Sequence, residues 1–145
     1  MTTWRLRDVA EAAGMSARSL RQAFDTGALK LSCDDKRATG SGSWVGLSIS
    51  RAYQAAIMKQ LNNIGLSLPV AAQAAAEFSN VGNINRKAGC LFDHGTTTLL
   101  LTQHGTTVKN TYSDTDLLAF PCAIVVNVNA IVDQIDLALI SKKAS

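Results

Sequence analysis

The chain of 145 residues has little of several features that mark specialised classes of protein. Its longest apolar stretch, Ala119–Val126, is far shorter than the ~20 residues that a membrane-spanning helix needs. Only 17% of the residues are charged and 6% are aromatic, whereas 47% are hydrophobic. This balance is typical neither of disordered chains nor of collagen-like ones. We therefore expect a globular protein with a buried core.

Cysteine is also scarce, and its count is odd. Cys33, Cys90 and Cys122 do not form a disulfide framework, which favours a reducing compartment. No apolar segment follows the basic residues at the N-terminus, so no secretory signal is expected. Together these absences predict a cytoplasmic protein.

Neither a metal centre nor a catalytic site is expected. Cys90, His94, His104 and Cys122 are the candidate metal ligands. However, the two histidines fall at opposite ends of one predicted strand, roughly 26 Å apart at ~3.3 Å per residue. The two cysteines are therefore predicted to be small buried apolar groups. No phosphate-binding glycine loop, paired metal-binding histidine motif or nucleophile elbow is present, so we expect a non-enzyme without a cofactor.

Positive charge is concentrated in the N-terminal part. Residues 1–59 contain nine Lys and Arg against five Asp and Glu, a net charge of +4, whereas residues 60–145 contain five against six, a net charge of −1. An imbalance of this kind indicates that a surface for a polyanion, if there is one, lies in the N-terminal part.

The N-terminal pattern predicts two short helices and a hairpin, followed by two longer helices. Apolar spacing predicts a helix over Leu6–Ala13 that Gly14 ends. Ser16 is a good N-cap for a second helix from Ala17 to Gly27, which makes a helix-turn-helix unit. Two short strands are expected at 30–33 and 43–47, and helices at about 49–64 and 68–78.

The C-terminal pattern is of a different kind. Residues 80–87 are predicted to be a linker. The sequence His-Gly-Thr-Thr occurs at both His94 and His104, which predicts turns in a β-meander. Strands are expected at 89–93, 96–103, 106–112 and 123–128, before a closing helix that ends near Ser141. We therefore predict an α+β protein with one domain at 1–80 and a small α+β domain at 83–145.

Two segments of the N-terminal half resemble MerR-type winged helix-turn-helix proteins. Trp4–Ala10 (WRLRDVA), Gly14–Ser16 (GMS) and Ser19–Arg21 (SLR) resemble the opening of that family. Ser48, Ile57, Met58, Leu61 and Ile64–Leu68 (IGLSL) fall at the spacing of its third helix and the turn into its fourth. The resemblance covers residues ~4–78, and it implies four helices with a β-hairpin wing.

The sequence departs from the family at three places. The wing is a few residues longer than usual and lacks the common aromatic-arginine pattern near its second strand. Gln22 and Ala23 stand where the family usually carries paired aromatic residues. The long antiparallel coiled-coil helix that follows the family's fourth helix is absent. The family's dimer geometry, and its habit of activating promoters by untwisting them, are therefore not implied.

The resemblance implies that the second helix enters the DNA major groove and that the wing lies along the backbone. Arg18, Arg21 and Gln22 are then candidates to read bases, with Ser16 at the start of the same helix. The candidates for phosphate contacts are Arg5, Arg7, Lys36, Arg37 and Arg51. Alternatively, the helix face is simply solvated and Asp34 and Asp35 neutralise the wing. Trp44 would pack under the wing or against DNA.

We therefore expect a sequence-preferring protein that binds double-stranded DNA, most simply a transcriptional regulator. It would act as a homodimer or higher oligomer through residues 83–145, in the nucleoid of a bacterium or as a phage-encoded protein. An excisionase-like, architectural or packaging protein of a mobile element is one alternative. A protein-interaction module without DNA binding is another.

Overall fold

The computed structural model describes residues 2–36, 45–110 and 119–142, and it shows an α+β protein. The described part of the chain contains five helices, one sheet of two strands and one sheet of three, both antiparallel. The elements are β1 Trp4–Arg5, α1 Leu6–Ala13, α2 Ala17–Asp25, β2 Gly46–Leu47, α3 Ile49–Asn63, α4 Leu68–Ser79, β3 Thr97–Thr102, β4 Gly105–Asn110, β5 Ala123–Asn127 and α6 Val128–Ile140.

The predicted helices are confirmed to within a few residues, because their ends carry local signals. The side chains of Ser48 and Asn127 accept hydrogen bonds from backbone N–H groups in the first turns of α3 and α6. Pro69 lies in the first turn of α4, where its missing N–H costs nothing. No helix in the described ranges has both the length and the apolar character required to cross a membrane.

The small sheet differs from the predicted hairpin. β2 pairs antiparallel with β1, so that Leu47 lies opposite Trp4 and Gly46 opposite Arg5. The predicted strand at 30–33 is wrong, since only Lys36 bridges to Gly46 on that side. The reason is local: the backbone N–H of Ser32 donates to the carboxylate of Asp35 at 2.8 Å. The N–H of Ser32 is thus bonded to a side chain, so it is not available to pair with a neighbouring strand.

The larger sheet has the strand order β4-β3-β5. Leu100 lies opposite both Thr107 of β4 and Val125 of β5. Gln103 and His104 form the tight turn between β3 and β4, and Gly105 follows with a φ of 123°. The predicted strand at 89–93 is wrong, because Phe92 N–H donates to the Thr97 hydroxyl and the chain there is irregular.

The cysteines are also not where the sequence analysis placed them. Cys90 and Cys122 are exposed, like Cys33, so the prediction that these two are buried apolar groups is wrong. Cys90 lies in the irregular segment after α4, and Cys122 directly precedes β5. Both positions lie outside the regular elements whose apolar faces form the core.

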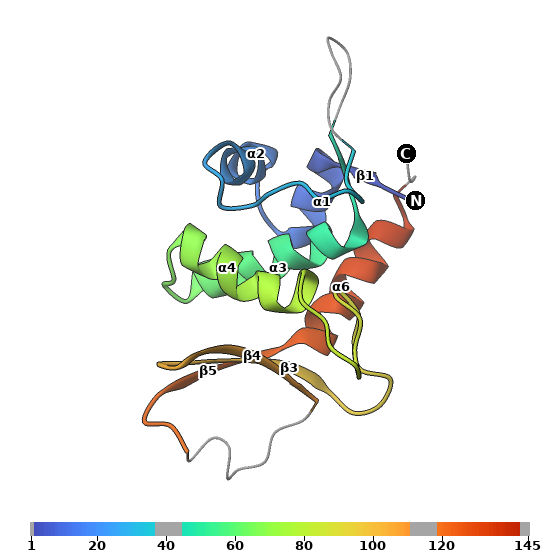
Figure 1. The fold of residues 1–145 in the computed structure, drawn as a ribbon. Coiled ribbons are helices and arrows are strands. Elements are labelled where there is room, and N and C mark those ends of the chain that lie inside the picture. The colour runs from blue at the N-terminus through green and yellow to red at the C-terminus, as the bar shows by residue number, and fades with distance from the viewer. Residues whose placement is uncertain (1, 37–44, 111–118, 143–145) are drawn as a thin grey trace.

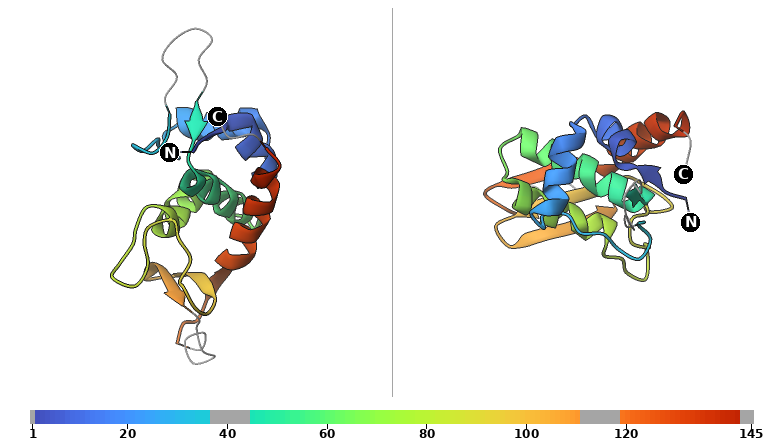
Figure 2. Two further views of the ribbon diagram at one scale, coloured as in Figure 1. Left: turned by 90° about the vertical axis from the view of Figure 1, so that its right-hand side faces the viewer. Right: turned by 90° about the horizontal axis from the view of Figure 1, so that it is seen from above.

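Helix α6 connects the larger sheet to the end of the molecule that contains α1 and α2 (Figure 1). It has 13 residues, about 20 Å of helix, and packs on α1, α3 and β3. Tyr53 of α3 donates to the Asp136 carboxylate at 2.6 Å, and Lys142 pairs with Glu11 at 3.1 Å. Figure 2 shows the same side-by-side arrangement of α6 with α1 and α3.

The predicted boundary near residue 80 falls directly after α4. The buried side chains on its two sides nevertheless belong to one hydrophobic cluster, in which Val9, Ile57 and Phe78 join Leu99 and Ile135. Helices α1 and α2, the α3–α4 pair and the three-stranded sheet therefore share a single core.

The segment that follows α4 is held in place by Arg86. Its side chain is buried, with 5% exposure. Nη1 donates to the carbonyls of Phe78 and Cys90 at 3.1 and 3.2 Å, and Nη2 to that of Val81 at 2.5 Å. The guanidinium also lies over the rings of Phe78 and Phe92. Residues 80–87 were predicted to be a linker, but these contacts fix the segment to the end of α4.

Candidate nucleic-acid interface

The turn between α1 and α2 is built as the sequence predicts. Gly14 takes a left-handed conformation (φ 76°) and its N–H donates to Glu11 at 3.1 Å. Ser16 then caps α2, since its hydroxyl oxygen accepts from the N–H of Ser19 at 3.0 Å. Ser16 is exposed, but this capping bond occupies its side chain.

Helix α2 has one buried and one exposed face. Leu20 and Ala23 are buried against the core. Arg18, Arg21 and Gln22 are all exposed, and at helical spacing they lie on the opposite side. Asp25 lies on this same outward face and is exposed too. The structure therefore brings the three predicted base-reading residues together, with one carboxylate among them.

The β1–β2 sheet brings two of the predicted phosphate contacts near each other. Arg5 and Lys36 are both paired with Gly46, from the two sides of β2. At ~4.8 Å per strand spacing, their backbones are roughly 10 Å apart. A Cβ at Gly46 would lie 2.7 Å from the Thr3 hydroxyl oxygen and 3.0 Å from the Lys36 Cβ. Any larger residue would therefore clash, which explains why this position is glycine. Arg5 and Lys36 are exposed.

Arg7 is also exposed, in the first turn of α1. It therefore lies at the same end of the molecule as β1 and α2, opposite the three-stranded sheet (Figure 1). Arg37 and Trp44 fall outside the described residues.

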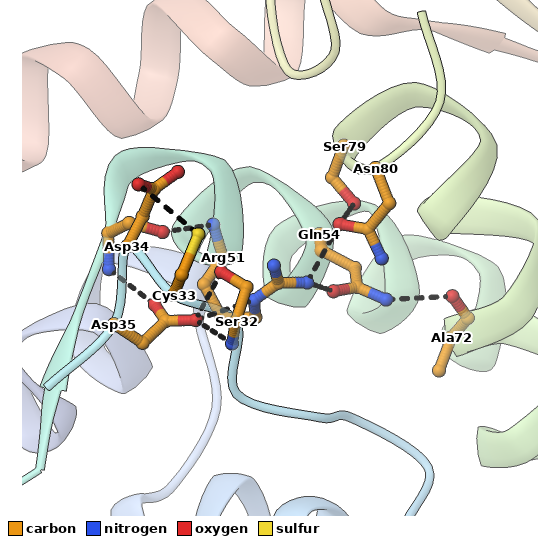
Figure 3. A network of polar contacts seen from close by, with 10 residues as sticks. Ser32, Cys33, Asp34, Asp35, Arg51, Gln54, Ala72, Ser79 and Asn80 are labelled. Atoms are coloured by element: carbon orange, nitrogen blue, oxygen red, sulfur yellow. Dashed lines mark hydrogen bonds and ion pairs between the residues drawn. The ribbon is translucent and has the colours of Figure 1, made fainter. Parts of the chain in front are cut away.

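Arg51 does not belong to this surface, and its prediction as a phosphate contact is corrected. It is only 3% exposed. Its Nε donates to the Asp35 carboxylate at 3.2 Å, and its Nη1 donates to the side-chain oxygens of Gln54 and Asn80, the latter at 3.0 Å (Figure 3). Gln54 in turn donates to the Ala72 carbonyl. Arg51 thus joins the segment before β2 to α3 and to the end of α4.

Asp35 is the centre of this network. Besides Arg51, its carboxylate accepts from the N–H and hydroxyl of Ser32 at 2.8 and 3.0 Å and from the N–H of Ser48 at 2.7 Å (Figure 3). Burial alone would raise the pKa of Asp35. The backbone hydrogen bonds and the charge of Arg51 outweigh burial, so that the pKa lies below its ordinary value of 3.8.

Sequence reasoning did not identify the Asp35–Arg51 pair. The two residues are 16 positions apart, and the sequence indicates Asp35 only as a residue that, with Asp34, neutralises Lys36 and Arg37. The one usable signal was composition, since an acidic pair directly precedes a loop with two basic residues.

The described residues do not bring three His, Cys, Asp or Glu side chains together as a group that could hold a metal ion. Comparison of the chain with models of known protein families and with curated proteins found no match in either.

Proposed function

We propose that this protein binds double-stranded DNA, with α2 as the helix that enters the major groove, and that it regulates transcription. The proposal starts from the resemblance of residues ~4–78 to MerR-type winged helix-turn-helix proteins. The observation that supports it best is the outward face of α2. Arg18, Arg21 and Gln22 are exposed together, on a helix whose opposite face is buried.

The side-chain chemistry of this face suits base edges. Arginine can bind guanine through two hydrogen bonds, and glutamine can bind adenine in the same way. Arg5, Arg7 and Lys36 would contact phosphates beside the groove. Asp25 on the same face would repel phosphate, or accept from the amino group of a cytosine, and so would contribute to discrimination between sites rather than to affinity.

DNA affinity tests this proposal directly. Arg18→Ala/Arg21→Ala should weaken binding to mixed-sequence duplex DNA by at least about 30-fold, since each arginine contact contributes roughly 1–3 kcal/mol. The measurement is fluorescence anisotropy across a salt series, because phosphate contacts make affinity fall as salt rises. Lys87→Ala/Lys142→Ala removes the same charge elsewhere and should retain most of the affinity. The assignment of α2 as the helix that reads bases is wrong if the wild-type protein fails to bind DNA at low salt. It is also wrong if both double variants lose the same amount of affinity.

Footprinting on long DNA, together with the affinity measurement, separates the regulator from its two alternatives. A discrete footprint on a site with two symmetric halves supports a regulator. Cooperative coating of long DNA would instead support an excisionase-like, architectural or packaging role. If the protein does not bind DNA, the remaining alternative is a protein-interaction module.

We further propose that the protein acts as a homodimer that pairs through the edge of the three-stranded sheet. In the described ranges no strand pairs with the outer edge of β5. Beside it lies a groove of about 350 Å³ formed with α3 and α6. The residues along it are uncharged: Gln60, Leu61, Ile64, Ile124, Val125, Val126, Asn127, Ala130, Ile131 and Gln134. Two-fold pairing sets the same surface patch against itself, and residues near the axis meet their own copies, so a patch without charge avoids repulsion between like charges.

Light scattering tests the pairing. Ile64 is 63% exposed at this groove, and Ile84 is 99% exposed elsewhere. We expect the wild-type chain to have a dimer's mass, Ile64→Lys to shift it to the monomer, and Ile84→Lys to leave the dimer intact. Neither exposed change should cost more than about 0.5 kcal/mol of stability. A monomeric wild-type chain, or a dimer that Ile64→Lys leaves unchanged, would refute this surface.

A further inference from the structure

A second cavity, of about 300 Å³, lies beside Arg51 and away from the exposed face of α2. Its walls come from four places. The segment before β2 supplies Lys30 and Asp34, the start of α3 supplies Ser50 and Arg51, the end of α4 supplies Asn80, and the segment after α4 supplies Ala88. The volume is at the lower end of the range for small-molecule sites. It is enough for a small ligand and far too narrow for a DNA duplex.

Arg51 brings unused hydrogen-bond donors to this cavity. A guanidinium has five N–H groups and no acceptor. Nε is bound to Asp35, and the two donors of Nη1 are bound to Gln54 and Asn80. Among the residues that the structure describes, no acceptor binds the two donors of Nη2 (Figure 3). Arg51 is 97% buried, and the two N–H groups of its Nη2 are thus available to a ligand in the cavity.

Two further donors line the same space. Ser50 lies in the first turn of α3, and its hydroxyl binds no acceptor in the described part of the chain. The backbone of Gly89 passes so close to this hydroxyl that a Cβ there would lie 2.3 Å from it. Lys30 adds an ammonium group at the exposed side of the cavity.

The balance of charge and hydrogen bonding favours an anion. Two carboxylates oppose Lys30 and Arg51, namely Asp34 and Asp35. Asp35 has no exposed side-chain surface and already accepts four hydrogen bonds, so it offers nothing to a ligand. Asp34 is exposed and, among the described residues of the wall, is the one that would repel an anion. The unused groups on the buried wall are donors, and a ligand rich in acceptors would satisfy them.

We propose that this cavity binds a small oxyanion, a phosphate or a carboxylate, through Nη2 of Arg51, the hydroxyl of Ser50 and the ammonium group of Lys30. The site is separate from the DNA-binding surface. Arg51 is too deeply buried to meet a phosphate of the duplex backbone, whereas a free ion can enter the cavity. This inference does not depend on the proposed DNA binding.

Titration of the full chain followed by ¹H–¹⁵N NMR tests the site. Inorganic phosphate and acetate are the two probes, each added up to about 10 mM, and the Nε–H resonance of Arg51 is the reporter. We expect saturable shifts at Arg51 and Ser50 with at least one probe. Lys30→Gln and Ser50→Ala should each weaken binding about fivefold, the value of one hydrogen bond, and Asp34→Asn should tighten it. Arg51 itself is left unchanged because it also neutralises Asp35.

Arg18→Gln is the matched control, since it removes an arginine from α2 and leaves the cavity alone. It should weaken DNA binding while phosphate or acetate binds as before, so failure of the oxyanion site and failure of the DNA proposal can be distinguished. No saturable shift with either probe would overturn the site. So would shifts that Lys30→Gln, Ser50→Ala and Asp34→Asn leave unchanged.

Discussion

Replacement of Asp35 by alanine is expected to lower the free energy of unfolding by about 3–5 kcal/mol, the usual cost of removing one partner of a buried ion pair. The positive charge of Arg51 would remain buried with its main counter-ion gone. The N–H groups of Ser32 and Ser48 would lose their acceptor as well. Because these groups hold the segment before β2 against α3, we expect that segment to lose its order along with the stability.

Urea denaturation followed by circular dichroism measures the effect. Asp34→Ala is the matched control, because it removes an adjacent carboxylate that is exposed and should cost no more than about 0.5 kcal/mol. Equal losses in the two variants would mean that the Asp35–Arg51 pair does not hold the fold together.

The same carboxylate predicts a dependence of stability on pH. The folded-state pKa of Asp35 is lowered from 3.8, so the unfolded chain binds the proton more readily than the folded one. The contribution is fully present above the unfolded pKa and is lost as pH falls below 3.8 through the folded value. Wild-type stability should therefore fall on acidification by more than that of Asp35→Ala, and the two curves should converge at low pH.

Replacement of Arg86 by methionine is the second large expected effect, a loss of about 3 kcal/mol or more. The guanidinium donates to five backbone carbonyls, those of Glu77, Phe78, Val81, Lys87 and Cys90. Methionine would keep much of the contact with the two phenylalanine rings but would supply no donor. Each buried carbonyl left without a partner costs about 1–3 kcal/mol, less where water can reach it.

Hydrogen exchange and urea denaturation together check this prediction. Protection should fall at the end of α4 and in residues 80–90, and the unfolding midpoint should move to lower urea. Lys87→Met makes the same kind of change at an exposed neighbour and should leave both measurements near the wild-type values. If Arg86→Met retains protection in residues 80–90, the carbonyl contacts do not fix that segment.

The parts of the fold that the sequence predicts are those with local signals. The ends of α1, α2 and α3 carry Gly14, Ser16 and Ser48, each of which acts on backbone groups within a turn of itself. The outward face of α2 follows from helical spacing in the same way. The larger sheet was also predictable in outline, since alternating apolar residues and a turn lie close together in the chain.

Apart from the predicted burial of Cys90 and Cys122, the errors involve contacts between distant residues or between side chain and backbone. Pairing of β1 with β2 joins positions more than 40 residues apart, and nothing near Trp4 indicates it. Arg51 was predicted to contact phosphate and Arg86 falls in the predicted linker, because composition does not reveal whether a charge finds buried partners. Asp35 and the carbonyls at the end of α4 and directly after it supply those partners only once the helices have packed.

The Arg86 contacts have a consequence for how two copies would meet DNA. With residues 80–87 anchored and α6 packed on α1 and α3, the described part of the chain offers no hinge between α2, the helix proposed to enter the groove, and the edge of the sheet. In a dimer joined through β5, the distance between the two α2 helices would therefore be fixed. Such a dimer would accept operators whose two halves share one helical phase and would reject those shifted by half a turn of the duplex.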